Sequence, residues 1–149
     1  MRLRFSRTAD YGLRAALEVA RVPAGSRVTR HAIAHATDAP PSVLAQALAG
    51  LVRAGLLAAL AGRHGGYQLA RPADEVSIYD VVFAIDGAER AERCVLHEGV
   101  CSWEGACPFH GVLVTAQEQF LDTLRATSLA DVLGGFPPAS APDAVEAAG

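Results

Sequence analysis

The sequence predicts a mainly α-helical fold with a small β-hairpin wing, in which a winged helix-turn-helix domain is followed by a long helix. Three observations carry this prediction. Apolar residues recur every three or four positions in several segments, as they do on amphipathic helices. Two of these segments flank a proline-containing turn, as in a helix-turn-helix. A glycine-rich hairpin pattern follows them, where a wing is expected.

The first helix is expected from Ala9 to Val22, because its apolar residues share one face. Pro23 and Gly25 end it. The apolar positions of this segment are Leu13, Ala16, Leu17 and Ala20.

A helix-turn-helix is expected between residues 29 and 55. Thr29 is a suitable N-cap for its first helix, and residues 37–40 form a tight turn. Pro41 stands at the first position of the second helix, and Gly55 ends that helix. The residues expected to face the interior are Ile33, Ala36, Leu44, Leu48 and Leu51.

Three residues near the start of the second helix, Ser42, Ala45 and Gln46, are expected to face outward. In a helix-turn-helix, these positions approach base edges in the major groove of DNA. Residues 56–60 and 67–71 are expected to form the hairpin, whose glycine-rich tip carries Arg63 and His64. A basic tip of this kind is able to place an arginine in the minor groove.

The charge is divided along the chain. Residues 1–71 contain ten arginines and three acidic residues, a net charge of +7, whereas residues 72–149 have a net charge of −10. All 13 basic residues are arginine, whose planar guanidinium suits phosphate contacts. The N-terminal half is therefore expected to meet double-stranded DNA. The candidate DNA-binding residues are Arg2, Arg4, Ser42, Gln46, Arg53, Arg63 and His64.

The C-terminal half predicts two more helices. Ser77 caps a helix that Gly87 stops, so the winged domain is expected to span residues 1–87. A long helix is expected from Phe109 to Arg125, with one more turn after Ser128, and we assign residues 108–133 to a dimerisation unit. The apolar stripe of that helix needs a partner, which favours a homodimer; packing on its own domain is the alternative. The stripe comprises Val112, Leu113, Ala116, Phe120, Leu121 and Leu124. Residues 134–149 are expected to be a disordered tail.

All three cysteines, Cys94, Cys101 and Cys107, lie within residues 88–107, and His110 follows three positions after the last. Thiolates on one short, glycine-containing loop are able to bind a single soft metal centre. The residues alone leave several readings open: a structural zinc site with three cysteines and one histidine, inert buried thiols, or a thiol redox switch. A metal centre would need a fourth ligand.

Composition narrows the class of protein. No uninterrupted apolar run approaches about 20 residues, and the arginine-rich start lacks the apolar core of a signal peptide, which predicts a cytoplasmic protein without a membrane partner. A small redox enzyme is a third possible class. The segregated arginines argue against it, as does the absence of a substrate-cradling glycine motif or a Ser/His/Asp arrangement. We therefore expect no enzymatic activity.

Four segments together resemble one family. They are M-R-L-R-F-S-R-T-A-D-Y-G-L-R-A-A-L at the start, the wing R-H-G-G-Y-Q-L-A-R-P, the three-cysteine loop, and A-Q-E-Q-F-L-D-T-L-R-A-T-S-L-A-D-V-L near the end. On these motifs the chain is similar to the IscR/NsrR-type (Rrf-two) winged-helix iron–sulfur transcription regulators, up to Gly134. The resemblance implies a homodimeric regulator, such as a repressor, that senses redox, nitric oxide or iron–sulfur status. The alternative is the same fold with structural zinc or a cluster-free thiol switch.

The resemblance also implies site residues. Cys94, Cys101 and Cys107 would bind a 2Fe–2S or 4Fe–4S cluster, although the first gap is one residue longer than in some relatives. The fourth ligand would be His110, or Asp10 from the other subunit, since both positions match ligands used within the family. Ala45 stands where the family's assembly regulators carry an acidic residue, so their DNA preference is not carried over.

Overall fold

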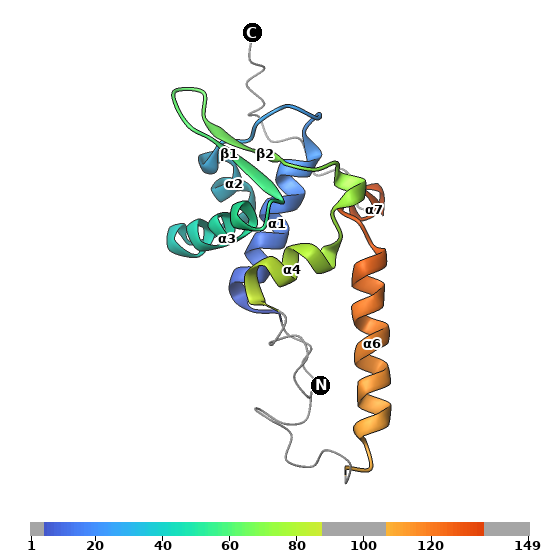
Figure 1. Cartoon of the computed structure of the whole chain (residues 1–149). Helices are drawn as coiled ribbons and strands as arrows, with labels where there is room; N and C mark the ends of the chain where they lie inside the picture. The colour runs from blue at the N-terminus through green and yellow to red at the C-terminus, as the bar shows by residue number, and fades with distance from the viewer. Residues whose placement is uncertain (1–4, 88–106, 136–149) are drawn as a thin grey trace.

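The computed structural model describes residues 5–87 and 107–135, and Figure 1 shows their arrangement. Its elements are α1 (Arg7–Arg21), α2 (Arg30–Thr37), α3 (Pro41–Arg53), β1 (Leu57–Leu60), β2 (Gly66–Leu69), the short 3-10 helix η1 (Ala73–Glu75), α4 (Ile78–Asp86), α6 (His110–Ala126) and α7 (Leu129–Gly135). This is a mostly helical fold with a two-stranded antiparallel hairpin, as the sequence predicts.

Helix α1 lies at the centre of the molecule, against α2, α3 and α4 (Figure 1). It begins at Ser6, whose hydroxyl accepts a hydrogen bond from the backbone N–H of Ala9 at 3.0 Å. Its buried face is built from small residues, which allow the helices to approach closely. A methyl group at Gly12 would lie 2.1 Å from Cδ1 of Ile85 on α4, so any larger residue there would force the end of the Ile85 side chain to move.

The helix-turn-helix forms as predicted. The Thr29 hydroxyl accepts a hydrogen bond from the N–H of Ala32, and Pro41 stands in the first turn of α3. Between the helices Asp38 adopts a left-handed conformation with φ of 50°, which aspartate tolerates better than most residues. Leu44, Leu48 and Leu51 of α3 are buried in the common core.

One predicted interior position in α2 is wrong. Ala36 is exposed, and the buried residue is Thr37, one turn after Ile33. The reason is that the Thr37 hydroxyl donates a hydrogen bond to the backbone carbonyl of Ile33 at 2.8 Å. Its polar group is thereby satisfied, and its methyl group is able to occupy the interior.

The hairpin follows α3 and ends in the wing tip, at the upper left of Figure 1. Strands β1 and β2 pair antiparallel in a register that runs from Leu57 opposite Leu69 to Leu60 opposite Gly66. The predicted strand 56–60 begins one residue before β1, whereas the predicted strand 67–71 begins one residue after the start of β2 and ends two residues beyond it. An additional bridge joins Val28 to Tyr67, so the segment before α2 lies along the outer side of β2.

The helices of the C-terminal half also match their expected bounds, except that α7 includes Gly134 and Gly135, which the sequence assigns to the tail. The rest of that tail and cysteine-loop residues 88–106 lie outside the described residues. No helix of the described ranges is both long and apolar enough to cross a membrane.

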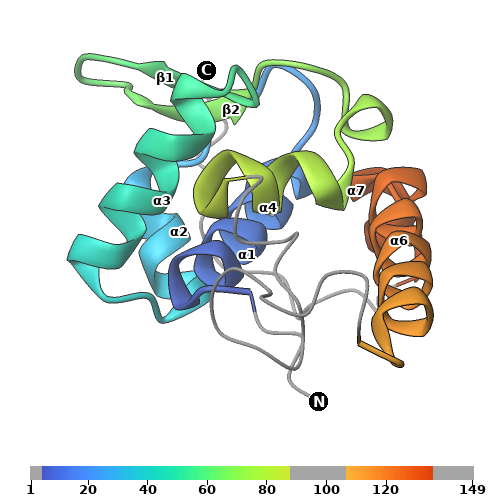
Figure 2. The same ribbon diagram turned by 60° about the horizontal axis from the view of Figure 1, so that its bottom comes forward.

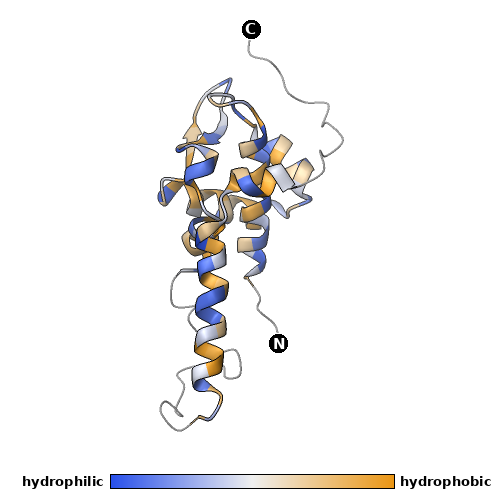
Figure 3. Ribbon diagram, turned by 90° about the vertical axis from the view of Figure 1, so that its right-hand side faces the viewer, coloured by the Kyte–Doolittle hydropathy of each residue, from blue (hydrophilic) through white to orange (hydrophobic). Residues whose placement is uncertain are grey.

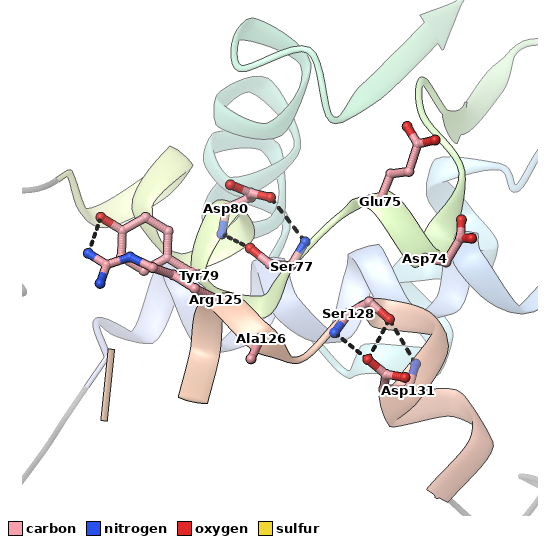
Figure 4. Close-up of a pocket in the computed structure, with 9 residues that line it drawn as sticks. All are labelled: Asp74, Glu75, Ser77, Tyr79, Asp80, Arg125, Ala126, Ser128 and Asp131. Atoms are coloured by element: carbon pink, nitrogen blue, oxygen red, sulfur yellow. Dashed lines mark hydrogen bonds between the residues drawn. The ribbon is translucent and has the colours of Figure 1, made fainter. Parts of the chain in front are cut away.

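A short antiparallel contact, here called the joint, links residues 76–78 to residues 127–129. Ile78 donates its N–H to the carbonyl of Thr127, and Leu129 donates to the carbonyl of Val76, both at 2.9 Å. Helices α4 and α7 both start at the joint. Figure 4 shows that each is capped by a serine and an aspartate three residues later, Ser77 with Asp80 and Ser128 with Asp131.

Helix α6 lies to one side of the bundle in both Figure 1 and Figure 2. Near its C-terminal end, Leu121 is buried, and the ring of Phe120 stacks with that of Phe5 at 6.2 Å between centroids. Toward its start, Val112 is 70% exposed and Phe109, the residue before the helix, is 60% exposed. Apolar and polar bands alternate along this helix in Figure 3. Its N-terminal part therefore presents apolar surface without a partner among the described residues.

Candidate nucleic-acid interface and cysteine segment

The outer edge of α3 carries the residues predicted to read DNA bases. Ser42 and Gln46 are exposed and one helical turn apart, with Ala45 partly exposed between them. Arg53 is exposed in the last turn of the same helix. Helix α3 thus presents polar side chains to solvent while its leucine face is held in the core.

Gln46 and Arg53 also line a hollow of about 160 Å³ together with Ser6, Thr8 and Asp86. Ser6 and Thr8 belong to the start of α1, and Asp86 is the last residue of α4. The Asp86 carboxylate accepts a hydrogen bond from the backbone N–H of Ser6 at 2.8 Å, across 80 residues of sequence. The start of α1 and the end of α4 are therefore fixed beside the outer edge of α3.

Ser6, Thr8 and Asp86 are not among the DNA-binding residues that the sequence predicts. The serine two residues after Arg4 is a recognisable N-cap, and this was the available signal. Its proximity to α3 depends on tertiary packing, which no local pattern reports. Arg2 and Arg4, which were selected, lie outside the described residues.

The wing tip presents Arg63 and His64, and both are exposed. The turn that carries them is closed by a hydrogen bond from the N–H of Gly65 to the carbonyl of Gly62 at 3.0 Å. Gly62 has φ of 102°, a conformation that favours glycine. The tip thus projects two basic side chains at the end of the hairpin, as predicted.

Cys107 and His110 lie together at the start of α6. Cys107 has a free, half-buried thiol, and the backbone N–H of His110 donates to its carbonyl at 3.2 Å. Among the described residues the His110 imidazole makes no hydrogen bond. The other two cysteines, Cys94 and Cys101, lie outside the described residues, and the described ranges contain no group of three or more potential metal ligands.

Asp10 is placed separately, on the first turn of α1. It is exposed, and its carboxylate forms an ion pair with Arg14 at 3.2 Å. In a surface position this pair contributes little to stability. The structure brings Cys107 and His110 together but does not bring Asp10 to them within one chain.

Arg125 fastens the end of α6 to α4. Its guanidinium lies 4.4 Å from the centre of the Tyr79 ring and donates to the Tyr79 hydroxyl at 3.3 Å. The hydrogen bond to Tyr79, followed by that to Asp122, raises the pKa of Arg125 above its ordinary value. Arg125 and Tyr79 line a hollow of about 430 Å³ beside the joint (Figure 4). The C-terminal end of α6 is therefore held to the winged domain by the contact between Arg125 and Tyr79 and by the two backbone hydrogen bonds of the joint that follows the helix.

Two known proteins are similar in sequence to most of this chain. HTH-type transcriptional regulator Rv1287 of Mycobacterium tuberculosis is 36% identical over 144 residues, which cover 91% of this chain and 84% of that protein. YwgB of Bacillus subtilis, named as a regulator of the same type, is 29% identical and covers 78% of this chain and 76% of its own.

Two solved structures share the architecture. CymR of B. subtilis, the global cysteine regulator of that organism, has a TM-score of 0.75 at 22% identity, covering 91% of this chain and 100% of its own. IscR of T. potens has a TM-score of 0.69 at 24% identity, covering 89% and 87%. The family model Rrf2, described as an iron-dependent transcriptional regulator, matches residues 5–135. The chain therefore belongs to the Rrf2 family, whose members are transcriptional regulators and not enzymes.

Proposed function

We propose that this protein is a homodimeric, cytoplasmic regulator that binds operator DNA and carries an iron–sulfur cluster on Cys94, Cys101 and Cys107. The observation that carries the proposal is the placement of Cys107 and His110 at the start of α6, the helix whose other end is held to the winged domain. The family description, an iron-dependent regulator, supports the choice of iron.

The chemistry of the donors fits such a cluster. Thiolates are its usual ligands, and imidazole is a known replacement. The Cys107 thiol is free and half-buried, and His110 follows on the first turn of α6. When bound, the cluster would supply the chemistry that reacts with oxidants or nitric oxide, or that depends on iron supply.

His110 is our proposed fourth ligand. Its imidazole has no hydrogen-bond partner among the described residues, and it is close to Cys107 in the chain. Asp10 of the other subunit is the alternative, and using it would require the carboxylate to leave Arg14. A ligand from α1 would in exchange connect the cysteine segment to the DNA-binding domain directly.

The residues at the two ends of segment 88–106 suggest how a change there would reach DNA. Before the segment, Asp86 holds the start of α1, beside Gln46 and Arg53. After it, α6 begins, and Arg125 ties the far end of that helix to Tyr79 of α4. A movement of the segment would therefore act on α4 from both ends and shift the position of α1 relative to α3.

For DNA binding we propose that Ser42 and Gln46 read bases, that Arg53 and the N-terminal Arg2 and Arg4 contact phosphates, and that Arg63 with His64 enters the minor groove. The exposed apolar part of α6 would join two copies, which would present two α3 helices to a palindromic site. Affinity should then fall steeply with salt, as expected for on the order of 6–10 phosphate contacts per dimer.

The test combines two measurements on one sample prepared without oxygen: an absorption spectrum with an iron and sulfide assay, then a DNA titration. The proposal expects a visible chromophore that is lost when any one of the three cysteines is replaced by serine. His110→Ala should alter the spectrum, while Asp10→Ala should leave it near that of the wild type. Bound zinc, or free thiols with unchanged DNA binding, would contradict the cluster and favour the zinc or thiol alternative. A weak salt response would contradict DNA as the partner.

A further inference from the structure

One arginine of the basic half is hydrogen-bonded to the tip of the wing. The guanidinium of Arg27 donates a hydrogen bond from Nη1 to the backbone carbonyl of His64, 37 residues away. Arg27 is exposed and comes just before Val28, which pairs with Tyr67 through two hydrogen bonds of 2.8 and 2.9 Å. The contact therefore joins the segment before the helix-turn-helix to the tip of the wing.

The backbone around this contact is closely packed. A methyl group at Gly66 would lie 2.7 Å from the carbonyl oxygen of Val28, and one at Gly65 would lie 2.6 Å from that of Leu60. Gly66 also has a φ of 156°. Gly66 thus allows the returning strand to lie directly against the segment that carries Arg27, and Gly65 allows the tip to turn back closely on the end of β1.

Beyond the last strand pair, Leu60 with Gly66, the tip depends on few interactions. Within the described residues these are the hydrogen bond between Gly65 and Gly62 and the one from Arg27. The bond from Arg27 is the one made by a side chain from outside the hairpin, and it holds the residue next to Arg63.

We propose that Arg27 is a positioning residue for the wing: it fixes the carbonyl of His64 so that Arg63 is already directed toward the minor groove before DNA binds. The inference rests on the proposed function, in which Arg63 enters that groove. A tip held in its bound conformation loses less conformational freedom on binding, which strengthens the complex.

The competing role for Arg27 is a direct phosphate contact, and a double-mutant cycle separates the two. DNA affinity is measured for the wild type, Arg27→Ala, Arg63→Ala and the double variant, on operators with A/T-rich and with G/C-rich flanks. If Arg27 positions the wing, Arg27→Ala should weaken binding roughly 3- to 10-fold at A/T-rich flanks, and this loss should disappear in the Arg63→Ala background. Equal, additive losses at both flanks, with a shallower salt dependence, would overturn the inference in favour of a phosphate contact.

Arg71→Ala is the matched control. Arg71 is also exposed and also donates a hydrogen bond to a backbone carbonyl, that of Glu75 at 3.1 Å. The substitution therefore removes the same charge and the same kind of hydrogen bond, but at a distance from the wing tip. It should leave the flank preference unchanged. A loss of flank preference equal to that of Arg27→Ala would contradict a specific role for Arg27.

A measurement without DNA distinguishes failure of this inference from failure of the proposed function. Amide hydrogen exchange at residues 62–66 should accelerate in Arg27→Ala and remain unchanged in Arg71→Ala. If exchange accelerates but Arg63→Ala does not change the flank preference, the minor-groove role of the wing is wrong while the structural role of Arg27 stands. Unchanged exchange in Arg27→Ala would overturn the inference by itself.

Discussion

The winged-helix body and helix α6 use apolar residues in opposite ways. In the body, the apolar faces of α1, α3 and α4 meet one another, and Leu44, Leu48 and Leu51 are almost completely buried. In α6, Leu121 alone is buried, and Val112 remains 70% exposed. The body buries its apolar faces within itself, whereas the start of α6 leaves apolar side chains uncovered by the described residues.

The stabilities of the two parts should therefore respond differently to protein concentration. The stability of the body is set by packing within one chain and should not depend on protein concentration. In the proposed dimer a second copy covers the apolar surface of α6, so the contribution of that surface to stability should depend on protein concentration. Substitutions in the two regions therefore have distinguishable consequences.

The largest effect is expected in the core of the body. Leu48→Ala should lower the free energy of unfolding by about 2–5 kcal/mol, because it leaves a cavity at a side chain that is 1% exposed. Thermal or denaturant unfolding measures this. The loss should be similar at low and high protein concentration. A strongly concentration-dependent loss would contradict the view that packing within one chain sets the stability of the body.

The next effect concerns self-association through α6. Val112→Asp should weaken the dimer roughly 10- to 100-fold, because a valine side chain that becomes buried contributes about 1.5–3 kcal/mol and a carboxylate there would lose its hydration. Sedimentation over a range of concentrations measures the dimer dissociation constant.

Gly111→Asp provides a control for this prediction. It introduces the same charge in the same helical turn, about 100° around the helix from Val112. Outside its own turn of the helix, no atom of the described residues lies within 4 Å of the Cβ atom that it would add. Dissociation by Gly111→Asp to the same extent would indicate a general effect of charge, and an unchanged dimer in Val112→Asp would mean that this face is not the interface.

The same comparison explains what the sequence was able to predict. The bounds of α1, α3 and α4 follow from local signals such as the Ser77 cap, Pro41 and the terminating Gly87, and these bounds agree with the structure to within about two residues. Helical periodicity also identified the apolar stripe of α6. The prediction that Ala36 faces the interior was wrong because the apolar pattern treats threonine as polar. The Thr37 hydroxyl instead forms a hydrogen bond within its own helix, which allows Thr37 to be buried.

Contacts between distant segments could not be predicted in this way. The bonds from Ser6 to Asp86 and from Arg27 to His64, like the joint at Ser77 and Ser128, each bring together residues far apart in the chain. Caps and periodicity describe geometry within a few residues, so they carry no information about these pairs. The sequence therefore predicted the candidate DNA-reading residues one at a time. It did not predict the hollow that groups Gln46 and Arg53 with the start of α1.

The third prediction tests whether α7 belongs with the winged-helix body or with α6. Ser128 caps α7 as Ser77 caps α4, so Ser77→Ala and Ser128→Ala should each lower the free energy of unfolding by about 1 kcal/mol. Because α7 packs against α1, Ser128→Ala should leave the dimer dissociation constant unchanged. Thermal unfolding and sedimentation of both variants measure this. A Ser128→Ala variant that affects only dimerisation would place α7 functionally with α6.

The smallest effect is a pH dependence at the same cap. Hydrogen bonds from the backbone N–H and the hydroxyl of Ser128, both at 2.8 Å, lower the pKa of Asp131 below its ordinary value. A carboxyl group whose pKa is lower in the folded than in the unfolded state stabilises the fold at pH values above its unfolded pKa, which is about 4. This contribution is lost as the pH falls through the folded pKa.

Asp131→Asn should therefore lower the melting temperature slightly at neutral pH, and the gap from the wild type should narrow as the solution is made acidic. The effect should be small, because the group is fully exposed and water screens its interactions. Asp74→Asn is the control, since it removes an exposed carboxylate that makes no hydrogen bond within the described residues. A gap that widens on acidification would show that the charge of Asp131 does not stabilise the start of α7. The cap would then depend on the Ser128 hydroxyl, which donates to Asp131 but also accepts from its N–H at 3.1 Å.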